Sequence, residues 1–466
     1  MSSPRRPALI FVAALGVALW WSPPPGELSL DAWRLFAIFI TAIVAVIVNA
    51  LPILTASILA VAAAVLTGLL APDDAYAGFS NPAILLIVAA FLVADAVVKC
   101  GLGNRGGLWL ATRFGGSTLG LGYSIFLLDA VIAPAFPSST ARSGVLYPFA
   151  RSLADGAGAR PDEPARRKVG AFLMFSGMAS LTLSSALWMT AMVANPLGAE
   201  IARNAGVEVS FTRWLLAAAV PCICAMVVLP LLLHWLIDPE VRSTPEAPAA
   251  ARRALQALGP LTRNEWIVLV VFLSMVLLWA SAATFGIDST AVAFLGLGVL
   301  LTTNVITLQD IGKQGDVLAT FIWFAVLFTL SSQLNELGFM KFLGERLAHA
   351  LGGLPSPVVG YFLVAAYVVL HYLFVSQTAH MLALFGIFLD VGIQLGVTPA
   401  LLAFQLLFAT DYFSAITPQA SSANLLFVGS GYLSQRDLYR LGAVATAANF
   451  AIFSIIGTAW LWLVVR

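Results

Sequence analysis

Two short polar motifs interrupt long apolar stretches of this 466-residue sequence, and they are its best candidates for binding chemistry. The first, Phe136–Arg142, has the sequence Phe-Pro-Ser-Ser-Thr-Ala-Arg, and the second, Phe374–His380, has the sequence Phe-Val-Ser-Gln-Thr-Ala-His. Ser and Thr hydroxyls can cap a helix that restarts after a turn, and the unpaired N–H groups at such a start carry partial positive charge. Each motif therefore predicts an anion site at a break between two helices.

The apolar stretches around each motif indicate that it lies at the tip of a re-entrant hairpin. Residues 121–135 and 144–150 flank the first motif, and residues 358–373 and 381–389 flank the second. Each stretch is short for a straight helix across about 30 Å of hydrocarbon. Two such tips, one in each half of the chain, are typical of a secondary transporter with inverted repeats. Two Ser/Thr-lined kinks inside ordinary packed helices are the alternative.

The composition indicates an integral membrane protein. Hydrophobic residues make up 60% of the sequence and charged residues 10%, whereas soluble domains carry about 25% charged residues. The net charge of +1 gives no reason to expect a nucleic-acid partner. The three cysteines lack zinc-ligand or thioredoxin spacing, and neither His-Glu-x-x-His nor Gly-x-Ser-x-Gly is present. An intramembrane enzyme is therefore not predicted.

The order of apolar segments predicts an all-α polytopic membrane protein with about 11 transmembrane helices plus two re-entrant hairpins, in two inverted-topology repeats. The expected parts are an N-terminal helix and loop over 1–31, a first repeat over 32–237, a cytoplasmic linker over 238–263 and a second repeat over 264–466. We expect the hairpins at about 118–149 and about 355–393. Interrupted helices are expected to break at Asn195-Pro196 and Thr417-Pro418.

The positions of lysine and arginine predict the orientation. With the N-terminus in the cytoplasm, most of the 24 fall in inner loops, including Arg5, Arg6 and the cluster between residues 151 and 168. This holds only if the first hairpin has cytoplasmic flanks and the second opens to the other side. The expected location is the inner membrane of a bacterium.

Four segments resemble one transporter family. They are Gly78-Phe-Ser-Asn-Pro82, Lys99-Cys-Gly-Leu102, Pro137-Ser-Ser-Thr-Ala-Arg-Ser143 and His371-Tyr-Leu-Phe-Val-Ser-Gln-Thr-Ala-His380. They are similar to segments of the divalent anion/sodium symporter family, in particular its branch of 2-oxoglutarate/malate translocators and citrate/succinate or tartrate/succinate antiporters. The resemblance covers nearly the whole chain. It implies a secondary active transporter that moves di- or tricarboxylates by alternating access, and not an enzyme.

The resemblance also implies site residues. The family's hairpin tips carry a Ser-Asn-Thr signature that contacts substrate carboxylates and helps to hold sodium, and its second interrupted helix carries Thr-Pro beside the substrate. The matching positions, with Asn195 as a looser match, are Ser138, Ser139, Thr140, Ser376, Gln377, Thr378, Thr417, Pro418 and Asn195.

Departures from the family pattern bear on the coupling ion. Ser139 and Gln377 replace the central asparagines, and the doubled proline of sodium-coupled members is absent. Both departures favour anion exchange without a cofactor. The sequence does not exclude a sodium ion near Ser138, Ser139, Ser376 and Gln377. The alternative functions are a sodium-coupled dicarboxylate or sulfate symporter and, more remotely, an anion channel.

Arg142 and His380 follow the threonines of the two tips at matching positions. Arg142 at membrane depth is costly and could hold a substrate carboxylate in bidentate fashion, or it could pair with Asp129 across the hairpin. His380 could donate to the substrate, titrate near neutral pH or pack as a structural residue. Asp411, six residues before Thr417, is a proton or cation site or a helix-end residue.

The expected partners of the protein are a small carboxylate anion and the lipid bilayer. The sequence does not exclude a homodimer.

Overall fold

The computed structural model describes residues 6–161, 163–351, 353–374 and 376–465, and within them it confirms the all-α membrane fold. Nine of the described helices are long and apolar enough to cross a membrane. Shorter apolar helices at Arg6–Trp21, Ile53–Leu66 and Ser289–Thr302 add to them. The expected number of about 11 spans and the inverted repeats stay predictions, and Arg5 lies outside the described residues.

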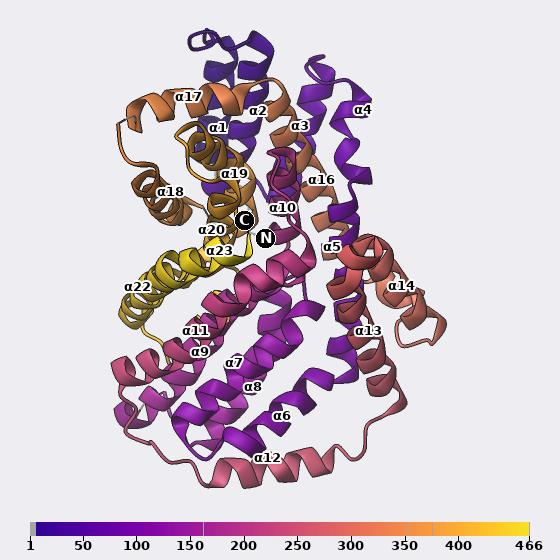
Figure 1. The fold of residues 1–466 in the computed structure, drawn as a ribbon. Coiled ribbons are helices and arrows are strands. Elements are labelled where there is room, and N and C mark those ends of the chain that lie inside the picture. The colour runs from indigo at the N-terminus through magenta and orange to yellow at the C-terminus, as the bar shows by residue number, and fades with distance from the viewer. Residues whose placement is uncertain (1–5, 162, 352, 375, 466) are drawn as a thin grey trace. The chain divides into compact units, whose positions relative to one another are not determined.

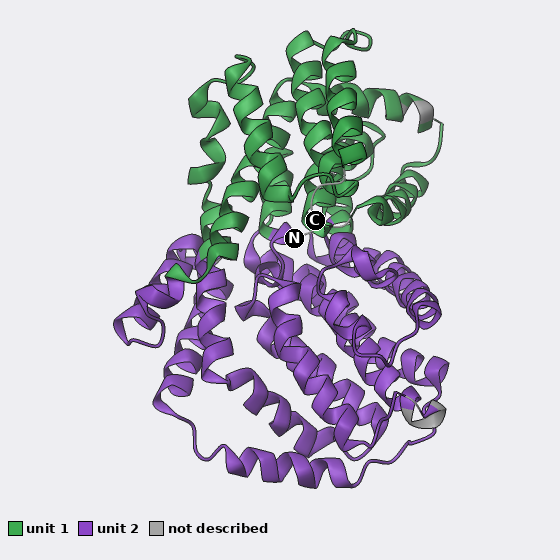
Figure 2. Ribbon diagram, turned by 180° about the vertical axis from the view of Figure 1, so that it is seen from behind, with its two compact units in different colours: residues 1–88, 196–209, 312–406 green, residues 89–195, 210–311, 407–466 purple. Residues whose placement is uncertain are grey.

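The chain folds into two compact units, and each unit combines segments from both halves of the sequence (Figure 2). Unit 1 comprises residues 1–88, 196–209 and 312–406, and unit 2 comprises residues 89–195, 210–311 and 407–466. Four helices contain a boundary: α5 (Pro82–Cys100), α10 (Ala194–Asn204), α15 (Leu308–Gly312) and α20 (Pro399–Tyr412). The expected division of the sequence into two successive repeats stays a prediction.

Helix α16 (Gly315–Glu336) organises one side of unit 1. The other elements are α1 (Arg6–Trp21), α2 (Leu30–Ile47), α3 (Ile53–Leu66), α4 (Pro72–Ala75), η1 (Ala77–Ser80), α17 (Phe339–Leu351), α18 (Ser356–Leu370), η4 (His371–Leu373) and α19 (Gln377–Gln394). Helix α16 packs against α2, α3 and η1.

The Gly78 N–H donates to the Thr329 hydroxyl at 2.9 Å, and a Cβ on Gly78 would collide with the backbone oxygen of Ala325. The contact between η1 and α16 therefore requires glycine at this position.

Helix α9 (Pro164–Leu187) lies at the centre of unit 2, and its apolar window is completely buried. It packs against α7, α8 and α11, which lie beside it in Figure 1. The elements of unit 2 besides α9 are α6 (Leu102–Phe114), α7 (Thr118–Ile132), η2 (Ala133–Ala135), α8 (Ser139–Gly156), η3 (Met189–Ala191), α11 (Phe211–Ile237), α12 (Glu246–Ala257), α13 (Arg263–Phe285), α14 (Ser289–Thr302), η5 (Phe413–Ala415), η6 (Pro418–Ala420), α21 (Asn424–Val428), α22 (Gln435–Ile452), the π-helical turn η7 (Phe453–Gly457) and α23 (Thr458–Val464).

Both polar motifs lie between two helices that pack on each other. Hairpin 1, residues 118–156, joins α7 and η2 to α8, and hairpin 2, residues 356–394, joins α18 and η4 to α19. The arms are longer than the apolar stretches predicted, because α8 continues to Gly156 through Arg151 and Asp155, which pair across one helical turn. The segments Thr118–Ala135 and Ser356–Leu373 are each 18 residues, enough to rank as candidate spans. Each segment joins a helix of 15 residues to a 3-10 turn and is not one straight helix, so the re-entrant path of the two hairpins stays a prediction.

The hydrophilic linker contains helix α12 and is fastened to the base of hairpin 1. The N–H of Thr118 donates to the carbonyl of Arg242 at 3.1 Å, and the N–H of Thr244 donates to the carbonyl of Gly116 at 3.1 Å. These bonds flank an isolated antiparallel bridge between Ser117 and Ser243. Helix α12 then packs along α6, as Figure 1 shows.

Lys99 fastens the end of α5 to α15 within unit 2. Its ammonium lies 3.0 Å from the Asp95 carboxylate, one turn earlier, and 2.6 Å from the Asp310 carboxylate. Hydrogen bonds from Lys99 and then from Thr307 hold the pKa of Asp310 well below its usual range. Asp310 therefore stays ionised at neutral pH, which maintains the ion pair.

Candidate functional site

The tip of hairpin 1 presents hydroxyl groups to two other parts of unit 2. Ser138 caps α8, with its hydroxyl accepting the Ala141 N–H at 3.3 Å. The Ser139 hydroxyl lies 3.2 Å from the hydroxyl of Ser185 on α9, and the Thr140 hydroxyl lies 2.6 Å from that of Ser422. The Thr140 and Ser422 side chains are exposed. The tip therefore offers a row of hydroxyl donors, and the outer pair is accessible.

Two asparagines hold the neighbouring helix breaks in the same way. Each side-chain amide donates to two backbone carbonyls, ten and seven residues earlier in the chain. The four bonds are Asn195 to Ser185 (2.9 Å) and Trp188 (3.3 Å), and Asn424 to Ser414 (2.7 Å) and Thr417 (3.0 Å). Because these carbonyls lie at interruptions in the helices, the amides supply hydrogen bonds that the helices no longer provide.

The backbone conformations extend this correspondence. Trp188 and Thr417 both precede a 3-10 turn in an extended conformation, with φ/ψ of −117°/123° and −122°/152°. Met192 and Ser421 end the turns at −145°/139° and −147°/137°. Asn195 and Asn424 thus make equivalent contacts at the two breaks. The position that corresponds to Thr417 in the first interrupted helix is Trp188.

The structure places Arg142 in an internal network, consistent with the alternative that pairs it with Asp129. Its side chain is 0% exposed, and its Nε lies 3.3 Å from Oδ1 of Asp129, which is also 0% exposed. The remaining nitrogens donate to the carbonyls of Ala191 (3.0 Å) and Leu181 (3.2 Å) and to the hydroxyl of Ser185 (2.5 Å). The guanidinium therefore fixes the tip of hairpin 1 to α9 and to the turn that follows it.

A second buried acidic residue, Asp411, lies in the same unit as Arg142. Asp411, near the end of α20, is 0% exposed and interacts electrostatically with Arg142 and with the Asn195 side chain. Asp129 is the carboxyl group that lies within ion-pair distance of the Arg142 guanidinium. The exposed hydroxyls of Thr140 and Ser422 are outside this buried cluster.

Hairpin 2 has the same tip but different packing. The Ser376 hydroxyl accepts the Ala379 N–H at 3.3 Å, and Gln377 and Thr378 are each only 7% exposed. His380 is 0% exposed, and its ring centroid lies 4.3 Å from that of Tyr367, 5.0 Å from that of Phe374 and 5.4 Å from that of His371. His380 is thus held inside unit 1 by a cluster of rings.

The predicted site residues fall into two groups, one in each unit. Unit 2 contains Ser138, Ser139, Thr140, Arg142, Asn195, Thr417 and Pro418, and unit 1 contains Ser376, Gln377, Thr378 and His380. The Thr417 hydroxyl is buried and has no hydrogen-bond partner among the described residues, so it has a donor to offer. Among those residues, no group of three or more His, Cys, Asp or Glu side chains could hold a metal ion.

Three residues of this region were not predicted from the sequence: Ser185, Ser422 and Asn424. The signal that could have found Asn424 is its distance from Asn195, since residues 188 and 195 repeat the seven-residue spacing of 417 and 424. Ser185 and Ser422 have no comparable signal because their partners are far away in the sequence.

The all-helical fold and its polar helix breaks are those of an integral membrane transporter, and the family comparison agrees. The chain belongs to the sodium:sulfate symporter family, because the model of that family's transmembrane region matches residues 5–466. It is accordingly a transporter and not an enzyme.

Relatives align over nearly the full chain. YflS of Bacillus subtilis (strain 168), provisionally named for malate transport, is 37% identical over 97% of this chain and 95% of its own length. Dicarboxylate transporter 2 of Spinacia oleracea chloroplasts is 36% identical, over 97% of this chain and 81% of its own. The citrate/succinate antiporter of Escherichia coli (strain K12) is 30% identical over 93% of each chain. The crystal structure of the Alcanivorax borkumensis YdaH transporter shares the fold, with a TM-score of 0.56 at 14% identity, over 98% of this chain and 96% of that one.

Proposed function

We propose that this chain moves dicarboxylates of the malate, succinate and 2-oxoglutarate class across a membrane by alternating access, as an anion exchanger. The names of its relatives support carboxylates as the substrate class. The observation that carries the proposal is the contact of 2.6 Å between the exposed hydroxyls of Thr140 and Ser422, which joins the hairpin 1 tip to a helix break. A carboxylate can replace this bond and accept from both hydroxyls.

The surroundings of this contact suit an anion. The tip is the start of α8, where N–H groups without helical partners and the helix dipole favour negative charge. The Thr417 hydroxyl adds a donor from the same helix break as Ser422. We assign the same role to Ser376, Gln377 and Thr378 at the corresponding tip in unit 1. Arg142 is then a positioning residue, because its donors are all directed into the protein.

The same arginine supports exchange over sodium coupling. Carbonyl and hydroxyl oxygens are the ligands that a hard cation such as sodium requires. At hairpin 1 the carbonyls of Leu181 and Ala191 and the Ser185 hydroxyl accept from Arg142 instead. A sodium ion near Ser138 and Ser139 would also meet the positive charge of the guanidinium. A sodium-coupled dicarboxylate or sulfate symporter is the second candidate, supported by the family's sodium:sulfate description.

The positions of lysine and arginine support an inner-membrane protein with its N-terminus in the cytoplasm.

The coupling is tested by counterflow in liposomes. Purified protein is reconstituted with unlabelled malate inside and labelled malate outside, with and without sodium. Uptake that needs internal substrate and ignores sodium supports exchange, uptake that needs sodium supports symport, and a current that does not saturate indicates a channel.

The site is tested by removing the two hydroxyls. A hydrogen bond to a charged group contributes about 1.5–3 kcal/mol, so Thr140→Val and Ser422→Ala should each raise the apparent KM for malate roughly tenfold or more. The matched control is Thr302→Val, because the Thr302 hydroxyl donates to the Gly298 carbonyl of its own helix. An unchanged apparent KM in both test variants would contradict this site. Competition by sulfate alone, with no effect of succinate or 2-oxoglutarate, would exclude the substrate class.

A further inference from the structure

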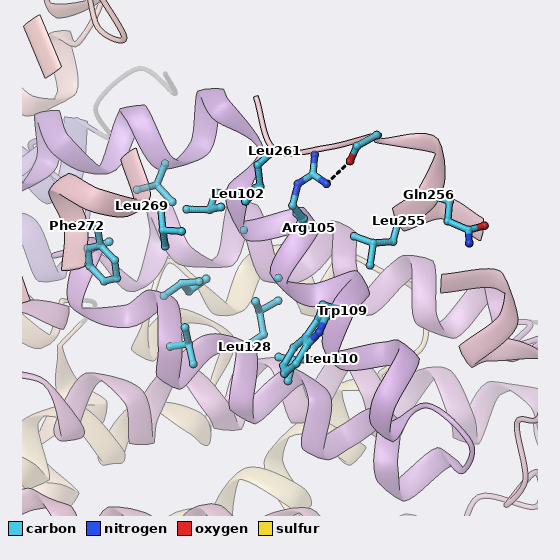
Figure 3. Close-up of a pocket in the computed structure, with 17 residues that line it drawn as sticks. Leu102, Arg105, Trp109, Leu110, Leu128, Leu255, Gln256, Leu261, Leu269 and Phe272 are labelled. Carbon is cyan, nitrogen blue, oxygen red and sulfur yellow. Dashed lines mark hydrogen bonds between the residues drawn. The ribbon is translucent and has the colours of Figure 1, made fainter. Parts of the chain in front are cut away.

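An apolar cavity of about 530 Å³ lies in unit 2 between α6, α7, α12 and α13 (Figure 3). Its walls include Trp109, Leu128, Leu255, Leu269 and Phe272. Of the 17 described residues that line it, only Arg105 and Gln256 carry a charged or amide side chain. An ordered water needs about two to four polar partners, and a dicarboxylate needs more. The cavity therefore suits hydrocarbon and not water or the transported anion.

The lining arginine is already neutralised. Arg105 Nε lies 2.6 Å from the Glu265 carboxylate, and its Nη1 donates to the carbonyl of Gly259 at 2.8 Å, the bond drawn in Figure 3. Arg105 thus holds the segment between α12 and α13 against α6. Because Arg105 is paired in this way, a charged lipid headgroup has to be held by residues outside the lining.

The helices that form the cavity carry an excess of positive charge on residues that do not line it. Helices α6 and α12 and the start of α13 contribute, apart from the Arg105–Glu265 pair, four exposed arginines and one exposed glutamate: Arg113, Arg252, Arg253, Arg263 and Glu246. Basic clusters beside membrane helices attract anionic lipid headgroups. Charge complementarity therefore favours a lipid with a net negative headgroup.

Helices α6 and α12 have the character of helices that lie at a membrane surface. On α12, Ala247 and Ala251 are buried whereas Arg252 and Arg253 are exposed, so apolar and charged residues occupy opposite faces. On α6, Trp109 is 50% exposed, which is typical of an indole at the interface between membrane and water. A lipid at this place would have its headgroup beside the arginines and an acyl chain beside Trp109.

We propose that this cavity binds an acyl chain of an anionic phospholipid, and that the bound lipid supports hairpin 1. Four residues of the first arm line the cavity: Leu128, Val131, Ile132 and Ala135. Asp129 lies between them in sequence, but it points to Arg142. A chain in the cavity thus packs on one face of α7 while the other face holds the ion pair that fixes the tip. This inference concerns a different part of unit 2 from the proposed substrate site and does not depend on which anion is carried.

Filling the cavity tests the assignment. Gly106 lines the cavity, and a Cβ added to it would lie 3.6 Å from Leu128 Cδ1, an ordinary contact, so Gly106→Leu should place its side chain in the cavity. The matched control is Asn104→Leu on the same helix, because Asn104 is exposed and is not among the lining residues. Native mass spectrometry of the full-length protein, supplied with phosphatidylglycerol and phosphatidylcholine, counts the lipids that each variant retains.

We expect wild type and Asn104→Leu to retain phosphatidylglycerol in preference to phosphatidylcholine, and Gly106→Leu to retain one molecule fewer. Val131→Trp provides a second way to fill the cavity, from a side chain that is 64% exposed and so places little demand on folding. The double variant Arg252→Gln/Arg253→Gln should lose the preference for the anionic lipid. Unchanged retention in both filling variants, or equal retention of the two lipids by wild type, would overturn the proposal.

Transport gives a second measurement. Counterflow of wild type and Asn104→Leu in phosphatidylcholine liposomes should rise severalfold when phosphatidylglycerol is added, and that of Gly106→Leu should not. An equal rise in Gly106→Leu would overturn the supporting role. Absence of malate counterflow in every lipid would instead count against the proposed function, and the lipid counts would still decide the cavity.

Discussion

The two hairpins have nearly the same backbone at the tip but different side chains between the arms. Ser138 and Ser376, 238 residues apart, have φ/ψ of −142°/121° and −141°/123°. Each hydroxyl accepts an N–H three residues later at 3.3 Å. One turn into the second arm, Arg142 pairs with Asp129 at 3.3 Å in hairpin 1. At the same two positions, hairpin 2 has His380 and Tyr367, whose ring centroids are 4.3 Å apart.

This difference separates two functions within a hairpin. Both hairpins have an extended phenylalanine after the 3-10 turn, Phe136 or Phe374, and a serine that caps the second arm. These two features determine the shape of the tip. The contact between the arms holds the tip in place, and it can be made from charges or from rings. Removing one member of a buried ion pair leaves an uncompensated charge, whereas removing a ring loses only packing. Hairpin 1 should therefore be the more sensitive to substitution.

The largest effect is expected from separating the charges in hairpin 1. Asp129→Asn and Arg142→Gln each leave an unpaired charge at 0% exposure and should destabilise the protein by about 3–5 kcal/mol. Thermal unfolding and size-exclusion chromatography of the purified variants measure this loss. If both single variants unfold at the same temperature as wild type, the ion pair does not hold the two arms of hairpin 1 together.

The hairpin 2 residues provide the matched control for that experiment. The double variant Asp129→Tyr/Arg142→His gives hairpin 1 the pair that hairpin 2 uses and leaves no single charge unpaired between the arms. We expect it to recover most of the stability that either charge-breaking variant loses. A double variant as unstable as the singles would mean that Asp411, which also interacts with Arg142, makes the guanidinium indispensable.

An intermediate effect is expected at the helix breaks, where the two copies are alike. Asn195→Ala and Asn424→Ala each remove an amide that donates to two carbonyls, at about 0.5–1.5 kcal/mol for each bond. The two variants should therefore lose similar amounts, about 1–3 kcal/mol, and both should slow malate counterflow. Thermal melts and counterflow are measured side by side. A large loss in one and none in the other would break the correspondence between the two breaks.

The smallest effect is expected inside hairpin 2. His380→Leu keeps a side chain of similar size but loses the edge-to-face contacts with Tyr367 and Phe374, at about 0.5–1.5 kcal/mol each. The variant should fold, bind malate normally and melt slightly below wild type. If His380→Leu abolished counterflow without a change in melting temperature, the histidine would act on the substrate.

The hairpin tips could be predicted because a cluster of hydroxyl residues inside an apolar run is costly unless it caps a helix or binds a ligand. The partner of Arg142 could not be predicted, because the sequence offers a substrate carboxylate and Asp129 equally. Only the fold shows which of the two lies within reach of the guanidinium. His380 occupies the equivalent position, but its neighbours are rings, which the match between the motifs does not reveal.

Asn424 was missed for a different physical reason. Its partners are backbone carbonyls, which every residue has, so no residue type marks the acceptor. The two compact units were also beyond prediction, because four of their five boundaries fall inside helices, such as α5 and α20. The one hydrophilic linker that the sequence marks is instead fastened to hairpin 1 by the Ser117–Ser243 bridge.

The close fit between Gly78 and α16 has a consequence for biosynthesis. The ribosome synthesises Gly78 251 residues before Thr329, whose hydroxyl accepts from the Gly78 N–H. During that interval the glycine N–H lacks its hydroxyl partner. The early helices of unit 1 therefore enter the membrane as a provisional assembly and reach their final packing only after most of the polypeptide has been translated.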